Sequence, residues 1–537
     1  MKKNILLIFT DQQRFDTIAA AGNPHIKTPN LDRLCREGTR FSSAYTPSPV
    51  CVPARCSMHY GQYPINTGCF ENNYDMPEDG RPSVAAALTA TGYRTHAIGK
   101  RHFTPDPCAP RGFQTLEKQE EIVSDVWNDD YLQYLEANGC GYAVEPYGVR
   151  GEAYYVPQLS TLPPQHHPTQ WVGDRTIEWI KNHVSESEAL TSDLRPPTSS
   201  PFFLFSSIIH PHPPFSPPTP WHKLYRGPDM PLPKMADDNE SLYLYTNRIQ
   251  NRYKGRDAGR DIRLHQLIKA YYWASISFVD YQVGRIFQAL EETGQLDNTL
   301  IIFASDHGEF LGDYNCFGKR SFLDSAARVP MVCRLPGAFA AGAVCDTPVS
   351  LVDVMPTALA AAGVSCGADT PVCESGQAEV PAPRLDGEDL AKIAAGTSDR
   401  DTVFGHYQGA EAGIYMAVSK QWKYIWSAAD NQELLFDRIK DPDELRNRAN
   451  NVACGAAARN MRKRLQDHIR TMPGHEQVVD ADGWIVKEPV TLPDDPDAGL
   501  IVQDPPCFHD RLFIPGYSTE GIAGEDETGA DFDPLKK

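Results

Sequence analysis

Two carboxylates stand directly after apolar runs that are far apart in the sequence. Asp11 follows the run 4–10 and precedes Gln12, while Asp306 follows the run that begins at 299 and precedes His307. Such runs are typical of buried parallel strands, and open α/β sheets bind their ligands at the carboxyl ends of these strands. Oxygen ligands from two converging strand ends suit a hard divalent cation. Taken singly, either aspartate is better explained by an Asx turn.

A cysteine opens the next segment that could do chemistry. Cys51 begins a predicted helix that runs to about Tyr60, with Arg55 one turn along and Gly61 behind the helix. A thiolate is stabilised at a helix N-terminus beside an arginine, and the free backbone N–H groups there bind anions. Because a single cysteine is more often a small buried apolar residue, the surrounding sequence has to decide.

The segment 51–55, Cys-Val-Pro-Ala-Arg, resembles at every fixed position the Cys-x-Pro-Ser/Ala-Arg signature of the type I sulfatases of the alkaline phosphatase superfamily. The resemblance covers about residues 4–475. It extends, in chain order, to Asp-Gln at 11–12, Thr-Pro-Asn-Leu-Asp-Arg-Leu at 28–34, Gly-Lys-Arg-His at 99–102, Pro-His-Pro-Pro-Phe at 211–215, Ser-Asp-His-Gly-Glu at 305–309, Gly-Lys-Arg at 318–320, Arg-Val-Pro at 328–330 and Trp-Lys-Tyr-Ile at 422–425.

This resemblance implies two cofactors. The family's signature cysteine is converted to formylglycine, so Cys51 is expected to become 3-oxoalanine through a formylglycine-generating or radical maturase enzyme. Asp11, Gln12, Asp306 and His307 would hold one divalent cation together with an oxygen of the modified residue. Sulfatases more often carry Asp at the position of Gln12 and Asn at that of His307. Ca²⁺ is the first expectation, but an amide in place of an anionic ligand lowers the charge of the ligand set and leaves Mg²⁺ and Mn²⁺ open.

The resemblance also implies that the hydrated aldehyde is the nucleophile. One of its hydroxyls would attack sulfur, activated by the metal and by Asp306, and form a covalent sulfate ester. His102 is the candidate base for the second hydroxyl, whose deprotonation lets the ester collapse and release sulfate. A serine or a thiol lacks this second hydroxyl and would have to await water.

The resemblance also implies which side chains bind the sulfate group and protonate the leaving oxygen. His212 is the candidate acid that protonates the leaving alkoxide, with Lys319 beside it. Arg55 and Lys100 would neutralise the sulfate oxygens and orient residue 51. Two candidate substrate contacts from the polar loop after the cysteine helix are Asn72 and Asn73.

The elements that must position these residues alternate along the chain. Strands are expected at 4–10, 94–98, 202–209, 299–304 and 329–334, and helices at 29–37 behind a Thr28 cap, 51–60, 82–91 and about 262–293. This order predicts an α/β fold, with a large, mostly parallel sheet sandwiched by helices as in alkaline phosphatase. Short runs at 402–406, 414–418, 422–426 and 433–436 predict a smaller C-terminal antiparallel sheet, covered by a helix with Met461, Leu465, Ile469 and Met472 on one face.

We expect three parts in the chain. A catalytic domain spans 1–390, with polar insertions near 185–201 and 217–260, and a Gly/Ala/Pro-rich linker at 363–385 leads into a small α+β subdomain over 391–479. The irregular tail 480–537 would contact either another subunit or its own chain, which makes a homo-oligomer one of the expectations.

Composition excludes several other classes. A hydrophobic fraction of 41% is that of a globular protein, and 51 basic against 70 acidic residues give a net charge of −19. Neither nucleic acid nor an anionic membrane surface is therefore expected as a partner, and an anionic substrate needs a metal or a local cationic pocket. The 13 cysteines form no CxxC pair, and no signal peptide is recognisable. The chain is expected in the cytoplasm unless a leader was trimmed.

Two rival functions stay open. Phosphonate monoester hydrolases and related phosphodiesterases of the superfamily resemble this chain in the Asp-Gln and Asp-His pairs, but typically carry uncharged hydroxyl residues where Lys100 and His102 stand. The sequence therefore favours sulfate monoester hydrolysis. The other rival is a non-catalytic homologue that binds metal or sulfated glycan. No motif identifies the alcohol, which is a carbohydrate or a small aryl or alkyl group.

Overall fold

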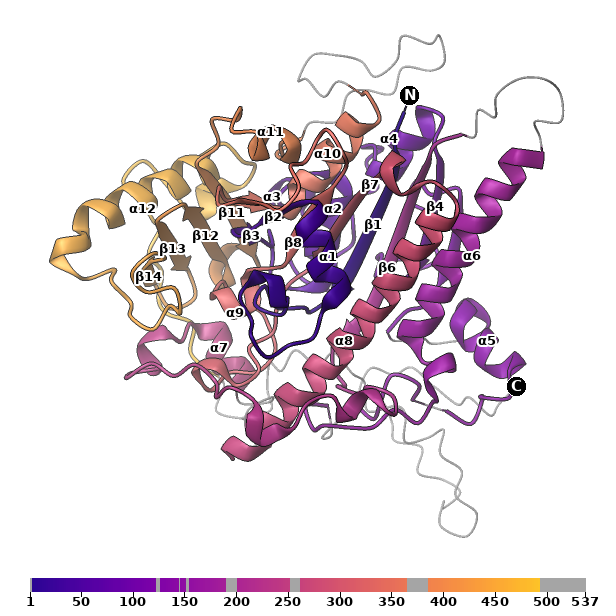
Figure 1. The fold of residues 1–537 in the computed structure, drawn as a ribbon. Coiled ribbons are helices and arrows are strands. Elements are labelled where there is room, and N and C mark those ends of the chain that lie inside the picture. Colours follow the sequence, from indigo (N-terminus) through magenta and orange to yellow (C-terminus); the bar gives the residue numbers. More distant parts are fainter. Residues whose placement is uncertain are drawn as a thin grey trace, which may run out of the picture.

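A sheet of eight strands, in the order β5-β4-β6-β1-β7-β8-β2-β9, forms the centre of the computed structural model (Figure 1). The structure describes residues 2–121, 126–143, 145–150, 154–189, 200–251, 261–364 and 385–492. The strands of this sheet are β1 (Asn4–Asp11), β2 (Thr39–Phe41), β4 (Arg94–Gly99), β5 (Thr115–Lys118), β6 (Phe202–Pro211), β7 (Thr299–Ser305), β8 (Met331–Arg334) and β9 (Ala343–Cys345). From β5 to β7 all pairs are parallel, whereas β8 is antiparallel to both of its neighbours. The predicted mostly parallel sheet is confirmed.

Helices cover both faces of this sheet because its central strands are apolar on both sides. In β1, Ile5 and Leu7 pack into one core and Leu6 and Ile8 into the other. The first face carries α2 (Cys51–Tyr60), α4 (Val84–Ala90), α10 (Val354–Ala361) and α11 (Leu390–Ala394). The second face, in front in Figure 1, carries α1 (Pro29–Glu37), α5 (Asp130–Ala137), α6 (Pro168–Ala189) and the long α8 (Ile262–Glu292).

The C-terminal sheet is a four-stranded antiparallel meander. Its strands are β11 (Thr402–Tyr407), β12 (Ile414–Ser419), β13 (Trp422–Ser427) and β14 (Gln432–Asp437). Helix α12 (Gly455–Arg470) packs Met461, Leu465 and Ile469 against one face, as predicted. Met472, predicted on the same helix face, instead follows the end of the helix. The other face joins a core with residues of the main body, including Tyr45 and Phe322. Shorter elements are α3 (Pro64–Thr67), α7 (Tyr245–Gln250), α9 (Asp324–Ala327) and the paired strands β3 (Ala44–Tyr45) and β10 (Val349–Ser350).

Three local predictions differ from the structure. Thr28 precedes α1 but makes no capping bond, because the carboxylate of Asp280 accepts the N–H of Leu31 at 2.7 Å instead. Helix α4 starts at Val84 rather than at residue 82. Ser83 is its N-cap, because the Ser83 hydroxyl accepts the N–H of Ala86 at 3.0 Å. Strand β8 starts at 331 rather than 329, since residue 330 is a proline and has no N–H to donate.

The stretch expected as a surface insertion over 217–260 contributes to the core where it is described. Tyr225 and Met230 are buried beside α8, and Leu242 is buried beneath the C-terminal sheet. The rest of that stretch, 252–260, lies outside the described residues, as do 190–199 of the other insertion, 365–384 of the linker and 493–537 of the tail.

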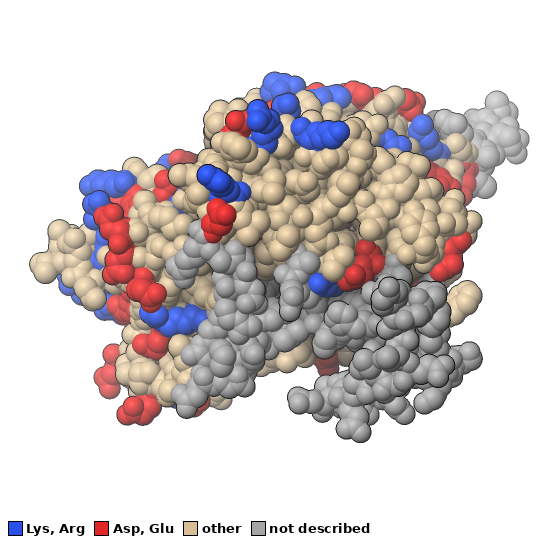
Figure 2. Space-filling view, turned by 90° about the horizontal axis from the view of Figure 1, so that it is seen from below, with Lys and Arg blue, Asp and Glu red and all other residues tan. Residues whose placement is uncertain are grey.

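Charge on the surface is mixed. On the face drawn in Figure 2, acidic and basic side chains of the described residues stand among uncharged ones, and the basic ones form no continuous patch there. Across the described ranges, every helix falls short of the length or the apolarity that a membrane crossing would need.

A buried lysine joins the C-terminal sheet to the main body. The Nζ atom of Lys423, on β13, lies 2.6 Å from a carboxylate oxygen of Asp324 and 2.6 Å from one of Glu444, and its side chain is fully buried. Burial and the neighbouring Asp324 raise the pKa of Glu444 to about 7. The two carboxylates therefore depend on the ammonium group between them.

Substituting Lys423→Met removes the buried cation that Glu444 contacts and leaves Asp324 with Arg328, at 3.2 Å. The expected loss is about 3–5 kcal/mol of unfolding free energy. A carboxyl whose pKa is higher in the folded than in the unfolded chain binds more protons when folded, so the loss should grow from mildly acidic to alkaline pH. Denaturant unfolding at several pH values measures it. Lys463→Met removes an exposed pair with Asp467 and serves as the control; equal losses in the two variants would contradict the assignment.

Candidate active site

Four neighbouring parallel strands end at one edge of the sheet and supply most of the predicted site. In sheet order, β4, β6, β1 and β7 deliver Lys100, His212, Asp11 and Asp306. The approach of β4 to β6 needs Gly99, which has φ of 89°, and a Cβ atom there would lie 1.9 Å from the carbonyl oxygen of Ser207. Only glycine lets the chain turn at this point and bring Lys100 over the strand ends.

Helix α2 presents the cysteine to this edge. Cys51 is its first residue, and all ten residues of the helix are buried. The Val52 N–H is satisfied by the side-chain oxygen of Asn72 at 3.0 Å. From the loop after β7, the Lys319 ammonium donates to the Cys51 sulfur at 2.9 Å. The nucleophile predicted from the signature therefore lies directly against strand-end residues that are distant in the sequence.

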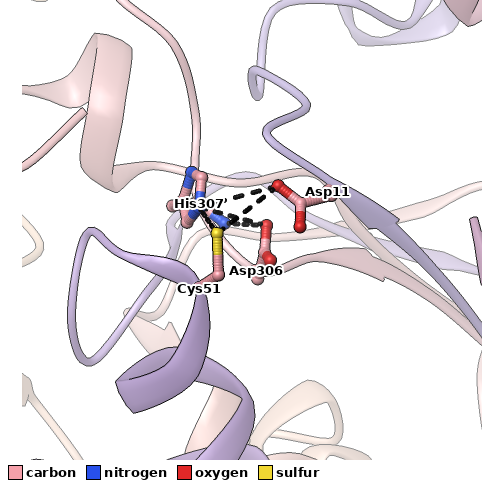
Figure 3. A group of neighbouring side chains, drawn as sticks. All are labelled: Asp11, Cys51, Asp306 and His307. Carbon is pink, nitrogen blue, oxygen red and sulfur yellow. Dashed lines mark hydrogen bonds and ion pairs between the residues drawn. The ribbon is translucent and has the colours of Figure 1, made fainter. Parts of the chain in front are cut away.

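Asp11, Cys51, Asp306 and His307 form a compact group of potential metal ligands (Figure 3). One ligand atom from each lies within 4.8 Å of all the others. The His307 Nε2 atom is 3.2 Å from the Cys51 sulfur, 3.8 Å from Asp11 Oδ1 and 3.6 Å from Asp306 Oδ1. Ligands about 2.0–2.6 Å from one ion lie roughly 3–4 Å from one another. These donors therefore fit a single divalent cation.

Arg55 and Lys100 take the carboxylate oxygens that face away from this group. Arg55 lies 3.1 Å from Asp11 Oδ2 and 2.9 Å from Asp306 Oδ2, and Lys100 Nζ lies 2.7 Å from Asp11 Oδ2. Arg55 and Lys100 thus contact the carboxylates of the predicted metal ligands directly. These contacts use the Oδ2 atoms, so the Oδ1 atoms face His307. Burial, followed by the charge of Asp11, raises the pKa of Asp306 to about 6. Such repulsion between two buried carboxylates favours a cation between them.

Gln12 is held by Glu309 and Lys319. Its side-chain nitrogen donates to Glu309, and its oxygen accepts from Lys319 at 3.0 Å. Glu309 also accepts the backbone N–H groups of Leu311 and Gly318, at 3.1 and 2.6 Å. The amide oxygen therefore points to the side where the Lys319 ammonium meets the Cys51 sulfur, and its role as a metal ligand stays a prediction.

The charges around Cys51 favour its thiolate form in the unmodified chain. Burial raises its pKa, but the charges of Lys319, Lys100 and His307, and a hydrogen bond from His102, together lower the pKa well below its usual value. Cations are thus concentrated at this sulfur, although the whole chain has a net charge of −19.

A second buried cluster surrounds His212. Its Nε2 atom lies 3.3 Å from Lys319 Nζ, and its Nδ1 atom lies 2.7 Å from the Pro213 carbonyl and 3.3 Å from the Glu121 carboxylate. Glu121 also pairs with Lys100, and with Arg150 at 3.2 Å. The Glu121 carboxylate thus contacts two of the predicted catalytic residues, Lys100 and His212.

The remaining predicted site residues, His102, Asn72 and Asn73, differ in how far they are buried. His102 is half-buried, and its Nδ1 atom has no hydrogen-bond partner among the described residues. Asn72 uses its oxygen for the start of α2, whereas Asn73 is exposed. A substrate contact through either asparagine remains a prediction.

Two residues of the site were missed from the sequence. Glu121 follows β5 without any motif of its own, so no sequence signal pointed to it. Glu309 stands inside the segment 305–309, which resembles the sulfatase family, but the resemblance by itself implied no role for this residue. Its position three residues after Asp306 was the available signal.

Comparison with known proteins agrees with this geometry. A family model described as Sulfatase matches residues 3–364, and one described as N-sulphoglucosamine sulphohydrolase, C-terminal, matches residues 312–471. An arylsulfatase of Clostridium perfringens is 30% identical, over 89% of this chain and 96% of that protein. The multifunctional alkaline phosphatase superfamily protein PehA of Trinickia caryophylli is 31% identical, over 85% of this chain and 93% of its own length.

Among solved structures, the phosphonate monoester hydrolase of Agrobacterium radiobacter superposes with a TM-score of 0.71 at 25% identity, covering 91% of this chain and all of that one. The fold, with Cys51 at a helix start beside two carboxylates at strand ends, is that of a hydrolase with the alkaline phosphatase-like architecture. Since the Sulfatase model spans most of the chain and the arylsulfatase matches over nearly its whole length, the chain belongs to the sulfatase family of sulfuric ester hydrolases.

Removing one strand-end carboxylate should remove the metal. Asp306→Asn keeps the shape but takes away a charge from the ligand group, so we expect the purified variant to retain much less divalent metal than the wild type, which should hold about one ion per chain. Elemental mass spectrometry after dialysis measures the content and identifies the ion. Asp174→Asn, at a partly exposed ion pair on α6, is the control. Unchanged metal in Asp306→Asn would refute this assignment of the site.

Proposed function

We propose that this enzyme hydrolyses a sulfate monoester at residue 51, with a divalent cation held by Asp11, Asp306 and His307. The observation that carries the proposal is the convergence of Lys319, at 2.9 Å, and His307, at 3.2 Å, on the Cys51 sulfur beside two buried carboxylates. The cation would polarise a sulfate oxygen, and formylglycine made from Cys51 would provide a hydroxyl nucleophile.

Lys319 is placed to bind the sulfate group. Its ammonium touches the sulfur of Cys51, the oxygen of Gln12 and the ring of His212, so it lies between the nucleophile and the candidate acid. A buried ammonium in this position stabilises negative charge on the oxygens of the reacting group. Lys100, tied to Asp11 and Glu121, adds to the same field and orients Asp11.

His212 is suited to protonate the leaving oxygen. A carbonyl oxygen can only accept, so the Nδ1 atom carries a proton toward Pro213, and the Nε2 atom faces Lys319. Proton donation from Nε2 therefore requires the imidazolium form. Burial lowers the pKa of His212, and the Glu121 charge opposes that effect. Glu121 thus positions and charges the acid without touching the substrate itself.

His102 is suited to act as the base. Its ring bonds to the Cys51 thiolate, and its Nδ1 atom has no partner in the described part of the chain. A half-buried imidazole beside residue 51 can take a proton from a hydroxyl there and release it to water. His102 is also one of the two residues, with Lys100, that favour a sulfatase over a phosphonate monoester hydrolase.

A phosphonate monoester hydrolase is the second candidate function. It is favoured by the similarity to the Agrobacterium radiobacter hydrolase, with its TM-score of 0.71, and by the pairs Asp11-Gln12 and Asp306-His307. Lys100 and His102 favour sulfate. The alcohol of the substrate, either a sulfated carbohydrate or a small aryl or alkyl sulfate, is best identified by a screen of desulfation.

Relative rates on two aryl esters should separate the candidates. Enzyme produced with a maturase is expected to give a higher kcat/KM on 4-nitrophenyl sulfate than on 4-nitrophenyl phenylphosphonate, and His102→Thr should lower the sulfate rate by about 10²-fold or more. Intact-protein mass shows whether residue 51 was converted. Faster phosphonate hydrolysis would favour the second candidate, and a converted protein that hydrolyses neither ester would refute both.

Removing the charge of Glu121 should change the pH profile. In Glu121→Gln the imidazolium of His212 loses its carboxylate neighbour, so its pKa falls and less of the acid form exists at neutral pH. The alkaline limb of the kcat profile should therefore move to lower pH, and kcat at neutral pH should drop by about tenfold or more. Glu117→Gln, near the surface on β5, is the control. A lower kcat with an unshifted profile would assign Glu121 a purely structural role.

A further inference from the structure

A pocket of about 400 Å³ lies beside the catalytic group but is lined by different residues. Its walls come from the segment after β1, from β2 and the start of β8, and from α8, including Arg14, Arg40, Lys269, Trp273 and Arg328. None of the predicted metal ligands or catalytic residues lines it. It is therefore a separate site on the sheet face that carries α1 and α8.

Arg14 and Tyr272 separate this pocket from the catalytic edge. The Arg14 guanidinium donates to the carbonyl oxygens of Glu309 and Phe310, at 2.8 and 3.0 Å. The Tyr272 hydroxyl donates to the backbone carbonyl of Gln12 at 2.7 Å. The two sites thus share a wall but no side chain that faces both.

Five basic side chains but only two acidic ones line the pocket. Both acids are used by one cation: Arg14 lies 2.7 Å from Asp16 and 2.8 Å from Asp313. Two other cations are neutralised by acids that do not line the pocket. These pairs are Lys234–Asp443 at 2.8 Å and Arg328–Asp324 at 3.2 Å.

Among the described residues, Arg40 and Lys269 form no ion pair with a carboxylate. Arg40, half-buried on β2, makes no side-chain hydrogen bond or ion pair within the described ranges, and its pKa is lowered by burial and by the nearby Arg328. The Lys269 ammonium is held by the carbonyl oxygen of Pro231 at 2.9 Å, and burial lowers its pKa to about 8. Two cations of this pocket thus form no ion pair in the described part of the chain, although Asp313 and Asp16 lie near Lys269, and the chain is acidic as a whole.

Aromatic and aliphatic surface completes the pocket. Phe15 lies under the Arg328 guanidinium, 4.2 Å from the ring centroid, and Trp273 stacks on His25 with centroids 6.2 Å apart. Leu311 and Val329 add aliphatic area. A pocket of this size that combines charged groups with apolar walls suits a small organic molecule rather than a bare ion.

We propose that this pocket binds a small organic anion, an acidic group on an apolar body, whose charge is neutralised by Arg40 and Lys269. The apolar body lies against Phe15 and Trp273, and the acidic group reaches the two unpaired cations. Carboxylates, phosphates and sulfates share the required charge. The ligand is bound independently of turnover at Cys51, because no catalytic side chain contributes to the pocket.

Calorimetric titration of the full chain with benzoate tests the proposal. Benzoate is expected to bind, whereas benzyl alcohol, which has the same apolar body without the charge, and inorganic sulfate, which has charge without the body, should bind more weakly by about tenfold or more. Cys51→Ala should bind benzoate as the wild type does. This readout does not depend on hydrolysis, so it stands or falls separately from the proposed sulfatase activity.

Variants locate the binding. Arg40→Met and Lys269→Met come from different elements, and each should weaken benzoate binding by about tenfold or more, since a charge-assisted contact is lost. Arg36→Met, an exposed arginine at the end of α1, is the matched control and should bind normally. Benzoate affinity that is unchanged in both pocket variants, or benzyl alcohol or sulfate binding as tightly as benzoate, would overturn the proposal.

Discussion

The contact on which the rest of the site depends is the pairing of Arg55 with Asp11 and Asp306. Two carboxylates at the ends of adjacent strands would repel each other in a buried position, and burial alone already disfavours their charged forms. The guanidinium spans both, at 3.1 and 2.9 Å, from within a fully buried helix. Because Arg55 and Cys51 belong to the same first turns of α2, the contact that holds the carboxylates also sets the place of the nucleophile.

Sheet order explains how distant segments reach this contact. In the chain, the strands run β1, β4, β6, β7, but in the sheet they stand β4-β6-β1-β7, all parallel. Their carboxyl ends therefore meet at one edge, where each strand presents a polar side chain from its last residue or from the one or two residues that follow. Rigid central strands hold these side chains more firmly than loops could, which suits a site whose charges must stay in register.

This arrangement also decides what the sequence could predict. Asp11, Asp306 and His307 could be found because an apolar run ends beside each of them, and the strand limits were right within about two residues where the run was long. The cap of α1 was wrong because its acceptor, Asp280, lies on α8 and becomes a neighbour only through packing. Glu121 was missed for the same reason, since its partners Lys100 and His212 come from other strands.

The unmodified cysteine shows why the lysines are placed as they are. In the unmodified chain, a Cys51 thiolate would place a negative charge beside Lys319, at 2.9 Å, whereas Lys100 is already paired with Asp11 and Glu121. Conversion to an uncharged aldehyde, as proposed, would remove that charge while Lys319 stays buried and positively charged. A sulfate ester carries one negative charge and would restore the balance. The cations that hold the precursor thiolate are thus the groups that would favour binding of an anionic substrate to the mature enzyme, despite the acidic surface of the whole chain.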